Sequence, residues 1–184
     1  MRLLGNLAVI IPVAPGDIAW TRLVDDLKRL PMEAEILFVG PELPSTVIRH
    51  LFEELASSQN VSWIQVPKGR GRQLNAGAKA TQKPYLWFLH ADSRLREPAL
   101  YALERSLKHK PDALHYFDLE FLDDGPRLTL INEIGVWFRS HVLGLPFGDQ
   151  GFCLARQLFQ GLGGFCEDTS YGEDHLLVWQ ARIQ

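Results

Sequence analysis

The chain has 184 residues, of which 46% are hydrophobic and 22% charged, and its formal net charge is −3. These values predict one soluble domain with a buried core. No lysine or arginine tract offers a basic face to a phosphate backbone, so nucleic acid is not expected as a partner. The first apolar run, residues 7–13, is too short for a signal peptide, and no run reaches the roughly 18 apolar residues of a membrane span, so we expect a cytoplasmic protein. Cys153 and Cys166 lack metal-type spacing and are expected to be reduced thiols.

The first half of the chain alternates short apolar runs with amphipathic stretches. This alternation predicts strands that crossover helices join into a mostly parallel α/β sheet, with helices on both faces. The expected strands are the apolar runs at residues 7–13, 35–40, 61–67 and 85–89.

The first two helices are expected to bury one face and expose the other. In the first helix the core face holds Trp20, Leu23, Val24 and Leu27, and the face toward water holds Asp25, Asp26, Lys28 and Arg29. The second helix is expected to begin at Pro44 and Ser45 and to pack through Val47, Ile48, Leu51, Phe52 and Leu55.

The segment "KGRGRQLNAGAKATQKPYLWFLHADSRL", residues 68–95, places an aspartate after a strand. It predicts a short helix that packs on the sheet through Leu74, Gly77, Ala78 and Thr81, and then a strand buried on both faces. Asp92 follows the carboxyl end of that strand, where open α/β sheets bind ligands. The alternative is that Asp92 and Ser93 only build a turn.

The second half begins with a helix and becomes less regular. Glu97 and Pro98 suit a helix start, and Leu100, Leu103 and Leu107 give that helix a packing face. A strand is expected within residues 113–122, with Phe117, Leu119 and Phe121 on one side. Residues 128–145 carry an apolar stripe of Leu130, Ile134, Trp137 and Phe138. We favour core packing for this stripe, and peripheral contact with a membrane is the alternative.

Six short motifs occur in the order found in family 2 glycosyltransferases: "VIIP", "GRGRQLNAGA", "FLHADSRL", "GDQG", "GGF" and "GEDHLL". The chain resembles the rSAM/selenodomain-associated transferase 2 family from about Leu7 to its last residues. The resemblance implies a single GT-A domain, with a nucleotide-binding half at about residues 1–95 and an acceptor-side half at about residues 96–184. It also implies a nucleotide-sugar donor, an unidentified acceptor and a metal-assisted, inverting transfer.

The donor of such a reaction leaves as a nucleoside diphosphate, whose developing charge is usually neutralised by a divalent cation, Mg²⁺ or Mn²⁺, on carboxylate oxygen. Asp92 is the expected ligand. Many relatives have Asp where "HAD" has His90, which predicts weaker metal binding, and we do not expect His90 to be a ligand. The resemblance also assigns Pro12 and Ala91 to the nucleotide-sugar site.

The glycine and arginine loop before the third helix is expected to bind the donor. Gly69 and Gly71 allow close approach of backbone, while Arg70, Arg72 and the helix amino end favour anions. A flexible exposed loop is the alternative. Asn75 either caps the helix locally or faces the ligand, and the resemblance favours the ligand.

The acceptor side is assigned by resemblance as well. Asp149 and Gln150 of "GDQG" are expected to orient hydroxyl groups, with a polar turn as the alternative. Glu173 is placed beside them, and Asp174 is expected to be the base that removes the acceptor proton. Two adjacent acids also suit a helix amino terminus without any catalytic role.

Two departures from relatives affect these expectations. Relatives usually carry Asp after the second strand to hold the base, but this chain has Gly40 there and Glu42 two residues later. Relatives generally continue past the position of Gln184, so an acceptor lid or a further metal ligand is expected to be missing.

Two other functions fit the sequence. A sugar-1-phosphate nucleotidylyltransferase also uses a glycine and arginine loop, but normally after the first strand, where this chain reads "VAPGD". A binding module that holds a nucleotide-sugar or a partner without turnover is the second alternative.

Overall fold

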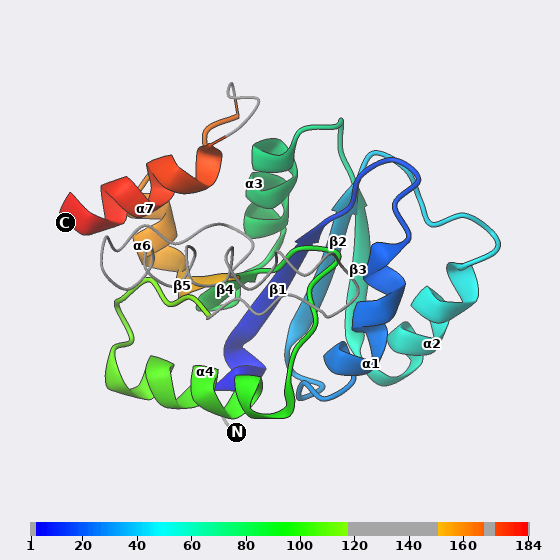
Figure 1. Cartoon of the computed structure of the whole chain (residues 1–184), viewed down its shortest axis with the longest axis horizontal. Helices are drawn as coiled ribbons and strands as arrows, with labels where there is room; N and C mark the ends of the chain where they lie inside the picture. Colours follow the sequence, from blue (N-terminus) through cyan, green and yellow to red (C-terminus); the bar gives the residue numbers. More distant parts are fainter. Residues whose placement is uncertain (1–2, 118–150, 168–171, 184) are drawn as a thin grey trace, which may run out of the picture.

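The computed structural model describes residues 3–117, 151–167 and 172–183. These residues form an α/β fold around a five-stranded sheet with strand order β3-β2-β1-β4-β5 (Figure 1). The strands are β1 (Leu7–Pro12), β2 (Glu35–Gly40), β3 (Asn60–Gln65), β4 (Tyr85–Phe88) and β5 (Phe152–Ala155).

Three of the four strand pairings are parallel. β1 lies between β2 and β4, with Ile10 opposite Leu37 on one side and Phe88 on the other. β3 extends the parallel sheet beyond β2, and β5 adds an antiparallel edge beside β4. The carboxyl ends of β1, β2, β3 and β4 therefore lie along one edge of the sheet.

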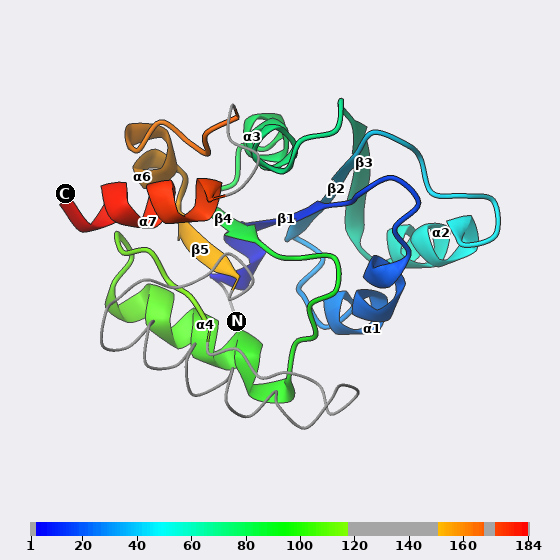
Figure 2. The ribbon, with the colours of Figure 1, turned by 45° about the horizontal axis from the view of Figure 1, so that its top comes forward.

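Helices cover both faces of this sheet (Figure 2). One layer contains α1 (Val24–Leu27), α2 (Arg49–Ser58) and α4 (Glu97–His109). The other contains α3 (Arg70–Ala80), α6 (Arg156–Gly161) and α7 (Glu173–Ile183). Short 3₁₀ turns, η1 (Leu4–Asn6) and η2 (Ala19–Leu23), precede β1 and α1.

The strand alternation separates two apolar cores. In β1, Val9 and Ile11 pack toward α1, α2 and α4, while Ala8 and Ile10 pack toward α3, α6 and α7. The first core contains an aromatic group in which Phe38 stacks on Trp63 with ring centroids 5.4 Å apart. β1, β2, β4 and β5 are largely apolar because they are buried on both faces, whereas the edge strand β3 is more polar and more exposed.

The predicted mostly parallel sheet, flanked by helices on both faces, is confirmed. Three local expectations were wrong. α2 begins at Arg49 rather than at Pro44 or Ser45, and Val47 is exposed rather than packed. Asp26 was expected to face water, but it is buried because it accepts hydrogen bonds from the segment after β4.

β5 and α6 were not predicted from the sequence. The expected strand within residues 113–122 is described only to Phe117, and there His115 forms a single antiparallel bridge with Cys153. The apolar stripe in residues 128–145 lies outside the described residues. Both cysteines are free, as expected. In the part of the chain that the structure describes, no helix has the length and apolar character needed to cross a membrane.

Candidate nucleotide-sugar site

The candidate site lies where the strand order reverses, between β1 and β4. Open α/β sheets bind ligands at the carboxyl ends of their strands, at the point where the strand order reverses. Pro12 ends β1 and is half-buried. The amide of Leu89 donates to the carbonyl of Ile10 at 3.0 Å, so the segment after β4 leaves from the same edge.

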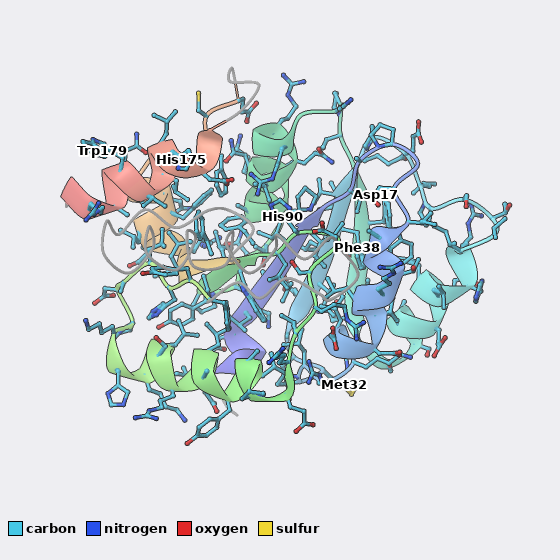
Figure 3. All side chains as sticks on the ribbon, viewed as in Figure 1. Asp17, Met32, Phe38, His90, His175 and Trp179 are labelled. Carbon is cyan, nitrogen blue, oxygen red and sulfur yellow. The ribbon has the colours of Figure 1, made fainter. Side chains whose placement is uncertain are left out.

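The segment after β4 carries the predicted metal ligand on a turn. His90 lies at the centre of the molecule (Figure 3), and its carbonyl accepts a hydrogen bond from Ser93 at 3.2 Å. Ala91 is buried, whereas the Asp92 side chain is 77% exposed. His90 Nδ1 lies 3.9 Å from Asp92 Oδ1. The turn therefore presents the Asp92 carboxylate to solvent beside an imidazole.

Three predicted or considered site residues converge on one another. Arg70, the first residue of α3, donates from Nη1 to Asp174 Oδ2 at 2.7 Å. Arg70 Nη2 also contacts His90 Nε2. These residues come from α3, α7 and the segment after β4, so the fold assembles one cluster from three distant parts of the sequence.

Asp174 is largely covered within this cluster. Its side chain is 17% exposed, and its Oδ1 is buried without a hydrogen-bond partner among residues 3–117, 151–167 and 172–183. Asp174 lies in the first turn of α7, where the helix dipole favours negative charge. Glu173 begins α7, and its side chain lies outside the described residues.

Asn75 is engaged with the chain itself. Its Nδ2 donates to the Phe165 carbonyl at 2.8 Å and to Glu167 Oε1 at 2.9 Å, and its Oδ1 accepts from the Phe165 amide at 2.9 Å. The side chain is buried and ties α3 to the loop after α6. Donor binding by Asn75 stays a prediction, and these long-range contacts are not the local helix cap that was the alternative.

Arg72 points to the same loop. Its Nε lies 3.5 Å from Glu167 Oε2, and its side chain is 47% exposed. The hydrogen bond from Asn75 and the pairing with Arg72 hold the pKa of Glu167 below its usual range. Gly71 is needed for a close approach, but the approach is to the Cys166 carbonyl rather than to a ligand, because a Cβ at Gly71 would overlap that oxygen.

A shallow hollow of ≈ 100 Å³ lies beside the carboxyl ends of β1 and β2. Val13, Asp17, Glu42 and Trp63 are among its lining residues. Trp63 Nε1 donates to the Glu42 carbonyl at 2.9 Å, which fixes the backbone of this loop. The Glu42 carboxylate therefore lies in a loop that borders the hollow, whereas Gly40 packs on β1: a Cβ at Gly40 would lie 3.0 Å from the Val13 carbonyl.

Two buried polar residues near the site were not found from the sequence. Gln73 donates from Nε2 to the carbonyls of Val13 at 2.8 Å and Val39 at 2.7 Å, and so joins the ends of β1 and β2. Asp26 holds the segment after β4 from the other face. The signal for Gln73 is a polar residue beside Leu74 on the packing face of α3. Asp26 gave none, because the sequence placed it with solvent-exposed neighbours.

The candidate site suits a hard divalent cation that takes one ligand from the protein and the others from a bound substrate and water. Mg²⁺ is usually held by one or two carboxylates together with substrate phosphates and water. Asp92 offers one exposed carboxylate of this kind. Among the described residues no group of three or more His, Cys, Asp or Glu could form an all-protein cage. Asp149 and Gln150, the predicted acceptor-side pair, lie outside the described residues.

The fold is shared with two kinds of solved structure. Residues 1–349 of S. aureus TarS align with a TM-score of 0.72 and 16% identity, over 95% of this chain and 54% of that chain. TarS has also been solved in complex with UDP-GlcNAc. The mannosyltransferase PcManGT from Pyrobaculum calidifontis, in complex with GDP-Man and Mn²⁺, aligns with a TM-score of 0.66 and 15% identity, over 93% of this chain and 50% of its own.

The chain thus spans about half the length of the structures that it matches. No protein-family model and no curated protein matches the sequence. The strand order, the two helical layers and the structural alignments together show that this chain has a GT-A-like fold.

Proposed function

We propose that this chain is a glycosyltransferase that moves a sugar from a nucleotide-sugar to an acceptor nucleophile. The observation that carries the proposal is the cluster of Arg70, His90 and Asp174 beside Asp92, at the switch point of a GT-A-like fold. Structural neighbours bound to UDP-GlcNAc or to GDP-Man and Mn²⁺ support a nucleotide-sugar as the donor class.

The donor diphosphate would lie between Asp92 and the amino end of α3. Asp92 would hold a divalent cation together with phosphate oxygens, and the bound ion would neutralise charge that develops on the leaving diphosphate. Arg70 and Arg72 supply guanidinium groups whose planar fork suits phosphate oxygen. The backbone N–H groups at the start of α3 add partial positive charge at the same place.

Asp174 would act as the general base of an inverting, family 2-like transfer. The base removes the acceptor proton while the acceptor oxygen forms its bond to the anomeric carbon, and the diphosphate leaves from the opposite face. Asp174 is ion-paired with Arg70. An arriving diphosphate would compete for this guanidinium, so donor binding would release the carboxylate for the acceptor.

The nucleoside base would occupy the hollow beside β1 and β2. Gly40 supplies no carboxylate to the imino N–H of uridine, so selectivity depends on shape and on Glu42. A site without a polar partner discriminates by only about 1–3 kcal/mol. We therefore expect uridine and guanosine diphosphates to bind with similar affinity.

The test is a thermal-shift screen of UDP- and GDP-sugars and their diphosphates, with Mn²⁺ and with chelator, followed by donor-hydrolysis assays. A ligand that binds the folded state raises its melting temperature. We expect stabilisation that requires the metal, together with slow donor hydrolysis. Stabilisation without hydrolysis or transfer would instead support the binding module, and no stabilisation by any nucleotide would overturn the proposal.

A further inference from the structure

The turn that carries Asp92 is fixed at both ends. At its beginning, Leu89 continues the sheet by donating to the Ile10 carbonyl at 3.0 Å. At its end, Leu95 is held on the opposite side by residues of α1 and the turn after it. These two anchor points hold the backbone on either side of the exposed Asp92 carboxylate.

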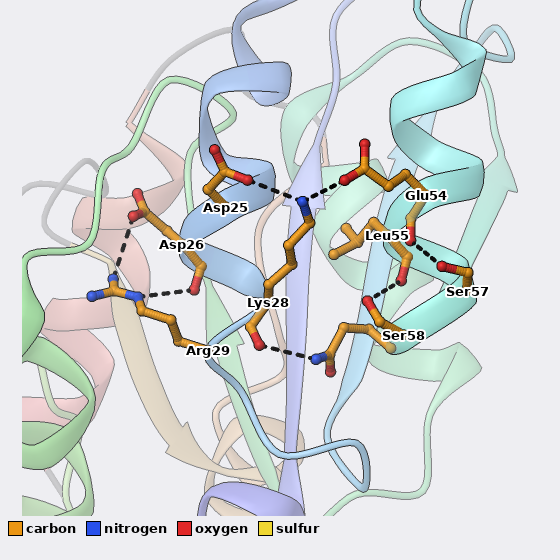
Figure 4. Close-up of polar contacts among 9 residues, drawn as sticks. Asp25, Asp26, Lys28, Arg29, Glu54, Leu55, Ser57 and Ser58 are labelled. Atoms are coloured by element: carbon orange, nitrogen blue, oxygen red, sulfur yellow. Dashed lines mark hydrogen bonds and ion pairs between the residues drawn. The ribbon is translucent and has the colours of Figure 1, made fainter.

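Asp26 forms the centre of the second anchor. Its Oδ2 accepts from the Leu95 amide at 3.0 Å and from Arg94 Nε at 2.8 Å. Its Oδ1 accepts from Arg29 Nη2 at 3.4 Å, and the same Arg29 nitrogen donates to the Leu95 carbonyl. Asp26 and Arg29 thus hold both polar groups of the Leu95 backbone. Figure 4 shows the contacts between Asp26 and Arg29.

The neighbouring residue Asp25 provides an internal contrast. Its side chain is 85% exposed and pairs with Lys28 at 3.0 Å on the surface (Figure 4). The Asp26 side chain is only 10% exposed. Removing one partner of a buried charged network leaves the remaining charges uncompensated, whereas exposed pairs contribute little. Removal of the Asp26 carboxylate should therefore disturb the surrounding structure far more than removal of the adjacent Asp25 carboxylate.

We propose that Asp26 is a positioning residue that sets the location of Asp92 for the divalent cation and the donor diphosphate. This inference rests on the proposed function, because Asp26 supports the turn that carries the proposed metal ligand Asp92. Asp26 does not touch the ligand. It acts through Leu95 and Arg94, which follow Asp92 closely in the chain, and a shift of a metal ligand by about 1 Å is enough to weaken a site.

The first experiment titrates Mn²⁺ at fixed UDP, and separately at fixed GDP, by calorimetry on the full chain. The variants are Asp26→Asn, the matched surface control Asp25→Asn, and Arg94→Gln. We expect the midpoint for Mn²⁺ to rise about five- to tenfold in Asp26→Asn and less in Arg94→Gln, because the Leu95 contacts persist there. Asp25→Asn should match the parent.

The second experiment measures amide hydrogen exchange of residues 89–96, with β1 and β2 as references. We expect exchange in 89–96 to accelerate at least tenfold in Asp26→Asn while β1 and β2 stay slow. A general loss of stability would accelerate all three regions together, and that result would overturn the positioning role. Restoration of slow exchange by Asp26→Glu would support it.

The calorimetric results for the parent and for Asp26→Asn distinguish failure of the proposed function from failure of the positioning role. If the parent binds neither UDP nor GDP with Mn²⁺, the proposed function is wrong and the role of Asp26 toward the metal is wrong with it. If the parent binds and Asp26→Asn has the same Mn²⁺ midpoint, only the positioning role is overturned.

Discussion

The two carboxylates of the candidate site occupy contrasting environments. Asp92 lies on a short turn and is 77% exposed, while Asp174 lies in the first turn of a helix and is 17% exposed. The turn is fixed from behind by Asp26, so Asp92 can face solvent without losing its position. Asp174 is instead held through its own carboxylate, which accepts a hydrogen bond from Arg70. In the proposed function, the donor side at Asp92 is thus open and the base side at Asp174 is closed, and we expect the donor to bind before the acceptor.

The largest effect is expected at the closed side. Asp174→Asn keeps the size of the side chain but removes the proton acceptor, so turnover should fall by about 10²–10⁴-fold. Donor affinity should not fall, because Asp174 competes with the diphosphate for Arg70 and the variant removes that competition. Single-turnover transfer and calorimetry on the same samples separate these two quantities. Turnover equal to that of the parent would remove Asp174 from the role of base.

At the open side, Asp92→Ala should abolish the dependence of nucleotide binding on Mn²⁺, a loss of several kcal/mol if the ion neutralises the diphosphate. The matched control is Asp112→Ala, an exposed aspartate in the turn after α4. Calorimetric titration of UDP with Mn²⁺ and with chelator measures the effect. Metal-dependent binding that persists in Asp92→Ala would place the ion elsewhere.

The two arginines of α3 should differ because only one joins the two sides. Arg70→Ala should weaken diphosphate binding by about 1.5–3 kcal/mol, the usual value for hydrogen bonds to charged groups. Arg72 is half exposed and pairs weakly with Glu167, so Arg72→Ala should cost less than about 1 kcal/mol. Affinities for UDP and GDP in both variants provide the comparison. Equal losses would show that Arg70 has no special position.

A variant of Asn75 tests whether this side chain stabilises the loop after α6 or binds the ligand. Asn75→Ala should lower the free energy of unfolding by about 1–3 kcal/mol, because it leaves polar groups of Phe165 without their partner. Asn60→Ala, at an exposed position of β3, is the control. Urea unfolding gives the stability, and a large loss of nucleotide affinity with unchanged stability would reverse this assignment.

The contrast between the two sides also separates what the sequence could predict from what it could not. The buried strands were predictable because a parallel sheet covered on both faces needs continuous apolar runs, and Asp92 followed from the end of such a run. The start of α2 was placed too early because Pro44 and Ser45 resemble a helix start, whereas the helix begins at Arg49.

Side-chain pairing was the part that could not be predicted. Asp25 and Asp26 are adjacent on the same short helix, and only the position of Leu95 makes one of them a buried anchor. The contact between Arg70 and Asp174 joins residues 104 positions apart. Neither contact leaves a periodic or local signal, because each depends on how distant elements meet at the sheet edge.

The smallest effect concerns pH, and it limits the range in which the two carboxylates can be compared. His115 is buried, its Nε2 donates to the Lys110 carbonyl at 2.9 Å, and its Nδ1 accepts from Ser106 Oγ at 2.7 Å. Burial lowers the pKa of His115 below its ordinary value of 6.5. As pH falls through 6.5, the unfolded chain takes up a proton before the folded chain does. The unfolded state then binds more protons, so stability decreases as pH falls and is fully present above that value.

Urea midpoints at pH 7.5 and pH 5.5 should therefore differ more for the parent than for His115→Gln, which cannot titrate. His50→Gln, at an exposed position of α2, should keep the difference seen in the parent. If His115→Gln retains the full pH dependence, other groups cause it. If the dependence disappears, His115 is its cause. Loss of transfer activity in the parent between these pH values must then be corrected for unfolding before any of it is assigned to Asp174 or Asp92. The correction is needed because unfolding removes the contributions of both carboxylates to activity at the same time.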